Sequence, residues 1–88
     1  MNPQPWSVEF ERRADRDLEQ LDPQVKRQVL TAIGRLVSDL RSVELRKLKG
    51  RPESRLRVGD WRVILELDVD ERIIIIERVL PRGRAYDR

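Results

Sequence analysis

Three arginines surround a predicted turn in a pattern that suits the binding of an anion. The dipeptide Gly59-Asp60 is typical of a two-residue β-hairpin turn, and a hairpin closed there places Arg57 directly opposite Arg62. Directly opposed residues lie on one face of a sheet, and Arg55 shares that face because it lies two residues before Arg57. Opposed arginines repel each other, but an anion between them would remove this cost, since the forked guanidinium donors match phosphate oxygens. We therefore predict a phosphate-binding site on an open face of the sheet, with Arg62 exposed there.

The same hairpin sorts its apolar side chains onto the other face. This apolar face is expected to rest on helices, and it consists of Leu56, Val58, Trp61, Val63, Leu65 and Leu67. The arginine face has a second interpretation, in which Glu66 or Glu77 neutralises the arginines within a surface network of salt bridges. Both interpretations fit the alternation of side chains.

A second basic cluster follows the last predicted strand. Arg82 and Arg84 flank a glycine, and Tyr86 comes two residues later. Because this segment leaves the sheet near the arginine face, its arginines are expected close to the same phosphate, and the Tyr86 ring could stack on a base. The alternative is that Tyr86 covers a small part of the core.

The positive charge of the chain is concentrated in one segment. The net charge is +3, but residues 41–62 hold 8 basic and 3 acidic residues, whereas residues 1–40 hold 6 and 7 and residues 63–88 hold 5 and 6. Such a segment indicates either a surface that faces a polyanion or an ordinary solvated loop. The chain has no histidine and no cysteine, so imidazole bases and thiolate metal sites are excluded. Any catalysis must depend on Arg, Lys, Tyr, Asp or Glu, and we expect no metal and no cofactor.

Hydrophobic periodicity predicts the elements that position these residues. A strand is expected near Trp6–Phe10, and two helices follow, with apolar stripes over 10–21 and 25–40. Asp22-Pro23 between them is typical of a helix N-cap followed by the first helical residue. Three further strands are predicted at 55–58, 61–68 and 72–80.

These elements predict a single domain over residues 1–88 with an α+β fold. It consists of an N-terminal strand, a two-helix hairpin and a three-strand antiparallel meander, with the helices packed on one face of a four-stranded sheet. The run Ile73–Ile76 indicates a central strand because it is apolar on both faces. No apolar stretch reaches the roughly 18 residues of a membrane-spanning helix and no signal peptide is visible, so we expect a cytoplasmic protein.

The middle of the chain resembles the signature of a known toxin family. Lys47-Leu48-Lys49-Gly50, followed by the segment Arg55–Ile64, is similar to the central block of RelE/ParE toxins, and the similarity extends from Trp6 to Tyr86 with the same order of elements. The resemblance implies the toxin of a type II toxin–antitoxin system. For the RelE branch it implies a metal-free endoribonuclease that cleaves mRNA, commonly on the ribosome, by attack of the 2′-hydroxyl on the adjacent phosphate.

The resemblance also implies roles for individual residues. The catalytic positions of the family are matched by Arg55, Arg62, Arg82 and Tyr86. The residues expected to bind RNA phosphates are Lys47, Lys49, Arg57 and Arg84. RelE has a further lysine where this chain has Glu53, which resembles the general base of some relatives; a simple turn residue is the alternative. Because the pKa of arginine exceeds about 12, it is a poor base, and positioning and electrostatics are expected to dominate.

The implied partners are a cognate antitoxin protein, mRNA and the ribosome, and the toxin–antitoxin complex is expected to bind operator DNA through the antitoxin. Two other functions stay open. The ParE branch has the same fold but inhibits DNA gyrase, and a decayed toxin would only bind its antitoxin. The combination of the arginines with Tyr86 favours the RelE branch.

Overall fold

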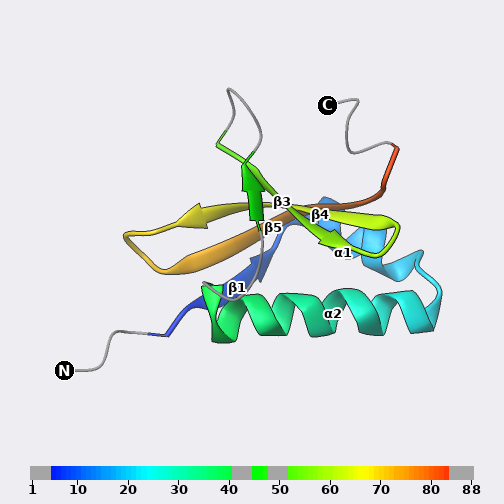
Figure 1. Ribbon diagram of the computed structural model, residues 1–88, viewed down its shortest axis with the longest axis horizontal. Coiled ribbons are helices and arrows are strands. Elements are labelled where there is room, and N and C mark those ends of the chain that lie inside the picture. The colour runs from blue at the N-terminus through cyan, green and yellow to red at the C-terminus, as the bar shows by residue number, and fades with distance from the viewer. Residues whose placement is uncertain (1–4, 41–44, 48–51, 84–88) are drawn as a thin grey trace.

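The structure of the chain is a computed structural model that describes residues 5–40, 45–47 and 52–83. Its elements, in chain order, are β1 (Ser7–Phe10), α1 (Arg12–Glu19), α2 (Pro23–Ser38), β2 (Leu45–Lys47), β3 (Ser54–Val58), β4 (Trp61–Asp68) and β5 (Ile73–Pro81). The strands form one mixed sheet in the order β1-β5-β4-β3-β2, and both helices lie on the same side of it (Figure 1). In the part of the chain that is described, no helix is both long enough and apolar enough to cross a membrane.

The predicted α+β architecture is confirmed, and one strand is added to it. β1 pairs in parallel with β5, while β3, β4 and β5 form the predicted antiparallel meander. β5 therefore lies between β1 and β4, as its apolar run Ile73–Ile76 indicates. The added strand is β2, which pairs antiparallel with β3 and widens the sheet from the four predicted strands to five. It lies in the basic segment, where the sequence pattern predicts no strand.

The helical layer begins where its local sequence signals place it. The Asp22 carboxylate accepts a hydrogen bond of 3.0 Å from the backbone N–H of Gln24, and Pro23 occupies the first position of α2. This cap separates α1 from α2 and lets the two helices form a hairpin. Trp6 and Trp61 are partly buried and pack against the core that lies between the two helices and the sheet. The buried core consists of Ala14, Leu18, Val29, Ile33, Leu36, Leu56, Val63, Leu65, Ile74, Ile76 and Val79.

β4 and β5 lose their regular register at one point. Ile64 pairs with Arg78, whereas the next residue, Leu65, pairs with Ile76. Glu77 is therefore an extra residue in β5, and β5 is bulged there. A bulge of this kind redirects the side chain of the extra residue, which matters for the candidate site.

The edge of β5 beyond β1 is held by a carboxylate of α1. β1 pairs with Ile73–Ile76 only, and further along β5 the backbone N–H of Val79 donates to Asp17 over 2.8 Å. The Arg78 guanidinium donates to both oxygens of the same carboxylate, over 2.9 and 3.1 Å. Burial acts to raise the pKa of Asp17, but these hydrogen bonds and the charge of Arg78 outweigh it and lower the pKa. The contact fastens α1 to the edge of the sheet.

Candidate functional site

The hairpin that carries the arginines has the predicted register. Arg57 pairs with Arg62 and Val58 with Trp61 across the turn. Gly59 has a φ of 57°, in the left-handed region that residues with a Cβ rarely adopt. The turn therefore depends on a glycine at this position, and the opposed arginines follow from it.

The two opposed arginines are not equivalent. Arg57 is exposed, as predicted. Arg62 is only 5% exposed, and its Nη1 donates to the carbonyl oxygens of Gly59 and Trp61 over 2.8 and 2.7 Å. The expectation that Arg62 lies exposed on an open face is therefore wrong. Its guanidinium folds back onto the turn, where the two carbonyls accept its protons.

The other predicted arginines extend this group in two directions. Arg82 is exposed, and its backbone N–H donates to the Asp60 carbonyl oxygen over 2.8 Å, which places it beside the β3–β4 turn. Arg55 pairs with Ile64 one step further along the hairpin and is 7% exposed. The structure thus brings three of the predicted arginines, Arg57, Arg62 and Arg82, to one end of the sheet.

Several predicted site residues lie outside the described part of the structure. These residues are Lys49, Arg84 and Tyr86. Lys47 is described only as the last residue of β2, where it pairs with Ser54. Their roles stay predictions.

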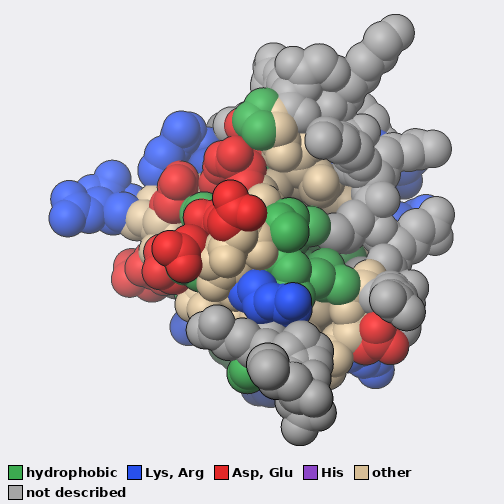
Figure 2. Space-filling model, turned by 90° about the vertical axis from the view of Figure 1, so that its left-hand side faces the viewer, with side chains coloured by type: hydrophobic (Ala, Val, Ile, Leu, Met, Phe, Trp, Pro, Cys, Tyr) green, Lys and Arg blue, Asp and Glu red, His purple; other side chains and the backbone are tan. Residues whose placement is uncertain are grey.

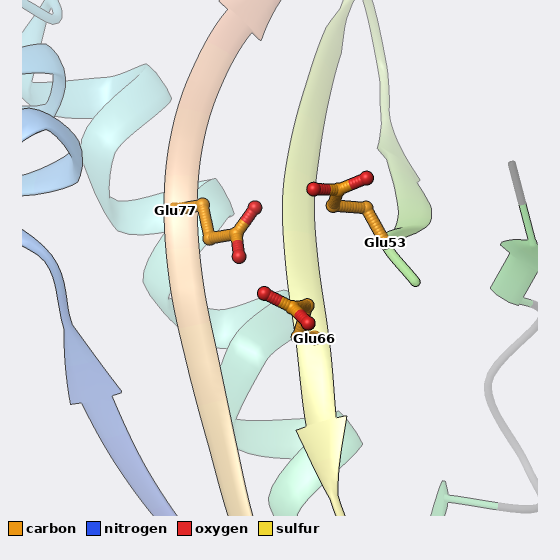
Figure 3. Close-up of side chains that lie close together, drawn as sticks. All are labelled: Glu53, Glu66 and Glu77. Carbon is orange, nitrogen blue, oxygen red and sulfur yellow. The ribbon is translucent and has the colours of Figure 1, made fainter. Parts of the chain in front are cut away.

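A cluster of three carboxyl groups lies further from the β3–β4 turn, beyond Arg55. Glu53 comes from the residue before β3, Glu66 from β4 and Glu77 from the bulge of β5, and one oxygen of each lies within 4.8 Å of the others. Figure 3 shows the three side chains pointing toward one another. Glu53 thus has two acidic neighbours, and its role as a base or a turn residue stays a prediction. The sequence pattern did not predict the cluster, because it depends on the bulge.

The cluster keeps a proton at neutral pH. Burial, a hydrogen bond with Glu66 and the negative charges of Glu66 and Glu53 raise the pKa of Glu77 to about 8. Glu77 is only 9% exposed. One oxygen of Glu53, Oε1, is buried and has no hydrogen-bond partner among the described residues. The cluster thus combines a proton held at Glu77 with an unsatisfied acceptor at Glu53.

The chemistry of this donor set allows two occupants. Carboxylate oxygens are the ligands that hard divalent cations prefer, so these three glutamates would be the ligands if the protein held such an ion. A shared proton relieves the repulsion between the same groups without an ion, as in other close carboxyl pairs. The raised pKa of Glu77 fits the shared proton.

The opposite end of the sheet is acidic. Asp68 ends β4, Asp70 and Glu71 occupy the turn that follows, and Figure 2 shows acidic side chains gathered at this end of the molecule. Asp68 accepts a hydrogen bond of 3.1 Å from the backbone N–H of Glu71. The exposed Arg57 and Arg82 lie at the other end of β4, so an anion is attracted toward that end.

The sequence matches a known family over most of its length. The family described as the ParE toxin of type II toxin–antitoxin system, parDE, matches residues 8–86. No protein with a curated description matches the sequence.

Solved structures of RelE proteins have a similar fold. A chain of the toxin–antitoxin complex RelBE2 from Mycobacterium tuberculosis is 28% identical with a TM-score of 0.74, over 90% of this chain and 100% of that chain. A chain of the archaeal RelE–RelB complex from Pyrococcus horikoshii is 25% identical with a TM-score of 0.77, over 92% and 99%. A chain of the RelB–RelE complex from Methanococcus jannaschii is 25% identical with a TM-score of 0.70, over 89% and 94%.

The family match covers nearly the whole chain, and the fold agrees with it from β1 to β5. Of the residues that carry the sequence resemblance, the segment Arg55–Ile64 forms the hairpin of β3 and β4, whereas residues 48–50 lie outside the described part of the chain. This chain therefore belongs to the RelE/ParE superfamily and is the toxin of a type II toxin–antitoxin system.

Proposed function

We propose that this toxin is a RelE-like endoribonuclease that cleaves mRNA. One observation carries the proposal: the hairpin of β3 and β4 bears an exposed arginine, Arg57, near its turn and two members of the carboxyl cluster, Glu53 and Glu66, near its other end. Glu53, Arg55 and Arg57 are spaced two residues apart, so they follow one side of the extended chain that leads from the cluster to the turn. The similarity to RelE chains at 25% identity or more supports this choice.

RNA cleavage without histidine requires three events that these residues suit. The 2′-oxygen attacks phosphorus as its proton leaves, the pentacoordinate phosphate is stabilised, and the bond to the 5′-oxygen breaks as that oxygen gains a proton. Arg57 and Arg82 are proposed to hold the phosphate, because both are exposed at the turn. Glu53 is proposed as the base, and the proton of the Glu66–Glu77 pair is the proposed source for the leaving oxygen.

The buried arginines have supporting roles in this proposal. Arg62 holds the carbonyls of the turn and so positions Arg57 and Arg82. Arg55 lies between the turn and the carboxyl cluster and is proposed to connect the two groups electrostatically. We further propose that the ribosome presents the mRNA, and that the reaction needs no metal and no cofactor.

The test is induced expression in growing cells, followed by mapping of mRNA 5′ ends. The proposal expects growth arrest with new 5′ ends inside translated mRNAs. Glu53→Gln should lower the cleavage rate at least about 100-fold, because it removes the base. Glu71→Gln removes the same charge from the exposed acidic turn and should leave cleavage unchanged. Growth arrest with intact mRNA would refute the proposal.

The family match favours a second function. The matching family is named for ParE and parDE, and the ParE branch implies inhibition of DNA gyrase. In that case the basic end of the sheet contacts gyrase or its DNA complex, and the carboxyl cluster is a structural feature. Plasmid supercoiling in the same induced cells distinguishes the two functions. Relaxed plasmid together with unchanged mRNA ends would establish gyrase inhibition.

We also propose that a cognate antitoxin neutralises this toxin by direct binding. The similar RelE chains were solved in complexes with RelB. Acidic residues of the antitoxin are expected to pair with Arg57 and Arg82, which would speed association and weaken with salt. Titration of the purified pair at low and high ionic strength, repeated with Arg57→Ala, tests this. Affinity that responds to neither change would exclude neutralisation by charge, and operator binding by the complex would then be tested separately.

A further inference from the structure

An open groove of about 770 Å³ runs between α2 and the end of β3. Its charged lining consists of Arg27 and Arg35 from α2 and Arg57 from β3, and none of the described residues that line it is acidic. The helix wall adds the neutral polar side chains of Gln24, Gln28 and Thr31. The groove therefore offers three positive charges and several hydrogen-bonding groups to whatever enters it.

The positive character extends along the whole of α2. The segment Pro23–Ser38 contains three basic residues, Lys26, Arg27 and Arg35, and no Asp or Glu. Arg27 and Arg35 are eight residues apart, which corresponds to a rise of about 12 Å along the helix. Both are exposed. One extended anionic ligand can therefore meet both guanidinium groups at separate points, which a single small anion cannot do.

The lining distinguishes between the two extended anions that could fit. An amphipathic peptide helix needs a row of apolar pockets for its anchors, but within the described part of the chain only Ala32 and Val58 contribute apolar side chains to this groove. Guanidinium and amide groups are instead the usual contacts of a nucleic-acid backbone, and forked arginine donors match phosphate oxygens. The groove thus favours a sugar–phosphate chain over an acidic helix.

The groove opens toward the proposed cleavage site. Among the described residues of β2, Leu45 pairs with Leu56, and Arg57 and Val58 follow it at the end of β3. Arg57 lines the groove and also pairs with Arg62 across the β3–β4 turn, where Arg82 lies. We propose that the groove binds the ribose–phosphate backbone of the substrate RNA strand outside the cleavage site, with Arg27 and Arg35 contacting different phosphates and Arg57 joining the groove to the turn.

This inference rests on the proposed RNA substrate, so its test separates binding from cleavage. The probe is a fluorescent single-stranded RNA with 2′-O-methyl groups, which cannot supply the attacking 2′-hydroxyl. Its anisotropy is titrated with the full chain at several salt concentrations. The double variant Arg27→Gln/Arg35→Gln is compared with Arg16→Gln/Lys26→Gln, which removes the same charge from exposed positions that do not line the groove. Thermal melting checks that both variants fold.

The groove variant should bind the probe about tenfold more weakly at low salt. The slope of log affinity against log salt should fall by about 1.4, because two phosphate contacts on a single strand are lost. The control variant should change both quantities much less. Equal losses of affinity in both variants would show that the RNA responds to diffuse positive charge and not to the groove. No loss of affinity in either variant would also overturn the proposal.

Two further arms identify what failed. If a polyglutamate peptide loses affinity for the groove variant while RNA does not, the occupant is an acidic peptide and the RNA assignment is overturned. If the wild-type chain binds the methylated RNA through the groove but cleaves no unmodified mRNA, the groove stands and only the proposed nuclease function fails.

Discussion

The sheet has two faces that are both buried at their centres but differ in chemistry. Under the helices, Val63 and Leu65 are fully buried in a continuous apolar core. On the other face, Arg62 of β4 and Glu77 of the β5 bulge are buried. Ile64 and Leu80 form a small apolar cluster that is separate from the main core. The apolar side chains of the first face need no hydrogen-bond partner when they are buried. The polar side chains of Arg62 and Glu77 do need one.

The difference shows how a protein of this size accommodates buried polar groups. An unpaired buried charge is strongly unfavourable. Arg62 avoids this cost by donating to two backbone carbonyls. Glu77 avoids it by keeping its proton, because burial and the neighbouring carboxylates raise its pKa to about 8. The polar face is therefore sensitive to single hydrogen bonds and to pH, and the apolar face only to packing.

The largest expected effect is on the apolar face. Ile76→Ala removes a fully buried side chain and leaves a cavity, and it should lower the free energy of unfolding by about 2–5 kcal/mol. Urea denaturation measures this. The control is Leu30→Ala on α2, where the side chain is 41% exposed and the change should stay within about 0.5 kcal/mol. Similar losses in both variants would contradict the assignment of the core.

The polar face should lose stability as the pH rises. The pKa of Glu77 is raised to about 8 in the folded chain against an ordinary value of 4.5, so the folded state binds more protons between these values. Its stabilisation is complete below pH 4.5 and is lost as the pH rises through about 8. We expect a fall of about 3 kcal/mol, less than the full difference implies, because the ionised carboxylates can turn toward water.

The control for this pH dependence is Glu77→Gln, which stays uncharged at every pH. Its unfolding free energy should be nearly flat over the same range, and above pH 8 the variant should be more stable than the wild type. A pH dependence as steep as that of the wild type would assign the titration to other groups.

The boundary between the helix layer and the sheet edge should respond to a single carboxylate. Asp17→Ala leaves the guanidinium of Arg78 and the N–H of Val79 without their acceptor, and it should cost about 2 kcal/mol at neutral pH. Because the pKa of Asp17 is lowered on folding, this stabilisation is present above its ordinary value of 3.8 and is lost as the pH falls below it. Glu19→Ala, an exposed change on the same helix, should matter little.

The smallest expected effect separates the two opposed arginines. Arg62→Ala removes two hydrogen bonds to the turn and should cost about 1–2 kcal/mol, whereas Arg57→Ala should change stability by less than about 0.5 kcal/mol. Melting curves of the two variants provide the measurement. Equal costs would show that exposure does not distinguish these residues, and a larger cost for Arg57 would reverse the comparison.

Local signals in the sequence were sufficient for most of the fold. Gly59-Asp60 predicted the hairpin and the opposition of Arg57 to Arg62, because a two-residue turn fixes the register of both strands. Asp22-Pro23 predicted the break between the helices. The run Ile73–Ile76 correctly predicted that β5 lies inside the sheet, between β1 and β4. It is not buried on both faces, because only Ile74 and Ile76 are buried and Ile73 and Ile75 are half-buried.

The rest depended on features that leave no periodic trace. β2 has three residues in a basic segment, too short for an alternating pattern. The bulge at Glu77 depends on the register between β4 and β5. It brings the side chain of Glu77 close to those of Glu53 and Glu66. Side-chain alternation assigned Arg62 to the correct face. It could not show that Arg62 would be buried there, with its guanidinium bonded to the carbonyl of Gly59 in the turn and that of Trp61 in β4.

The carboxylate of Asp17 also has a consequence for how the toxin behaves among copies of itself. An uncovered strand edge can recruit the strand of a neighbouring molecule and start aggregation. β1 covers β5 only up to Ile76, and beyond that point Asp17 already occupies the N–H of Val79. An incoming strand would have to displace a charged group that Arg78 holds in place. A single side chain thus lets the sheet end at a short strand without offering this part of its edge to another chain.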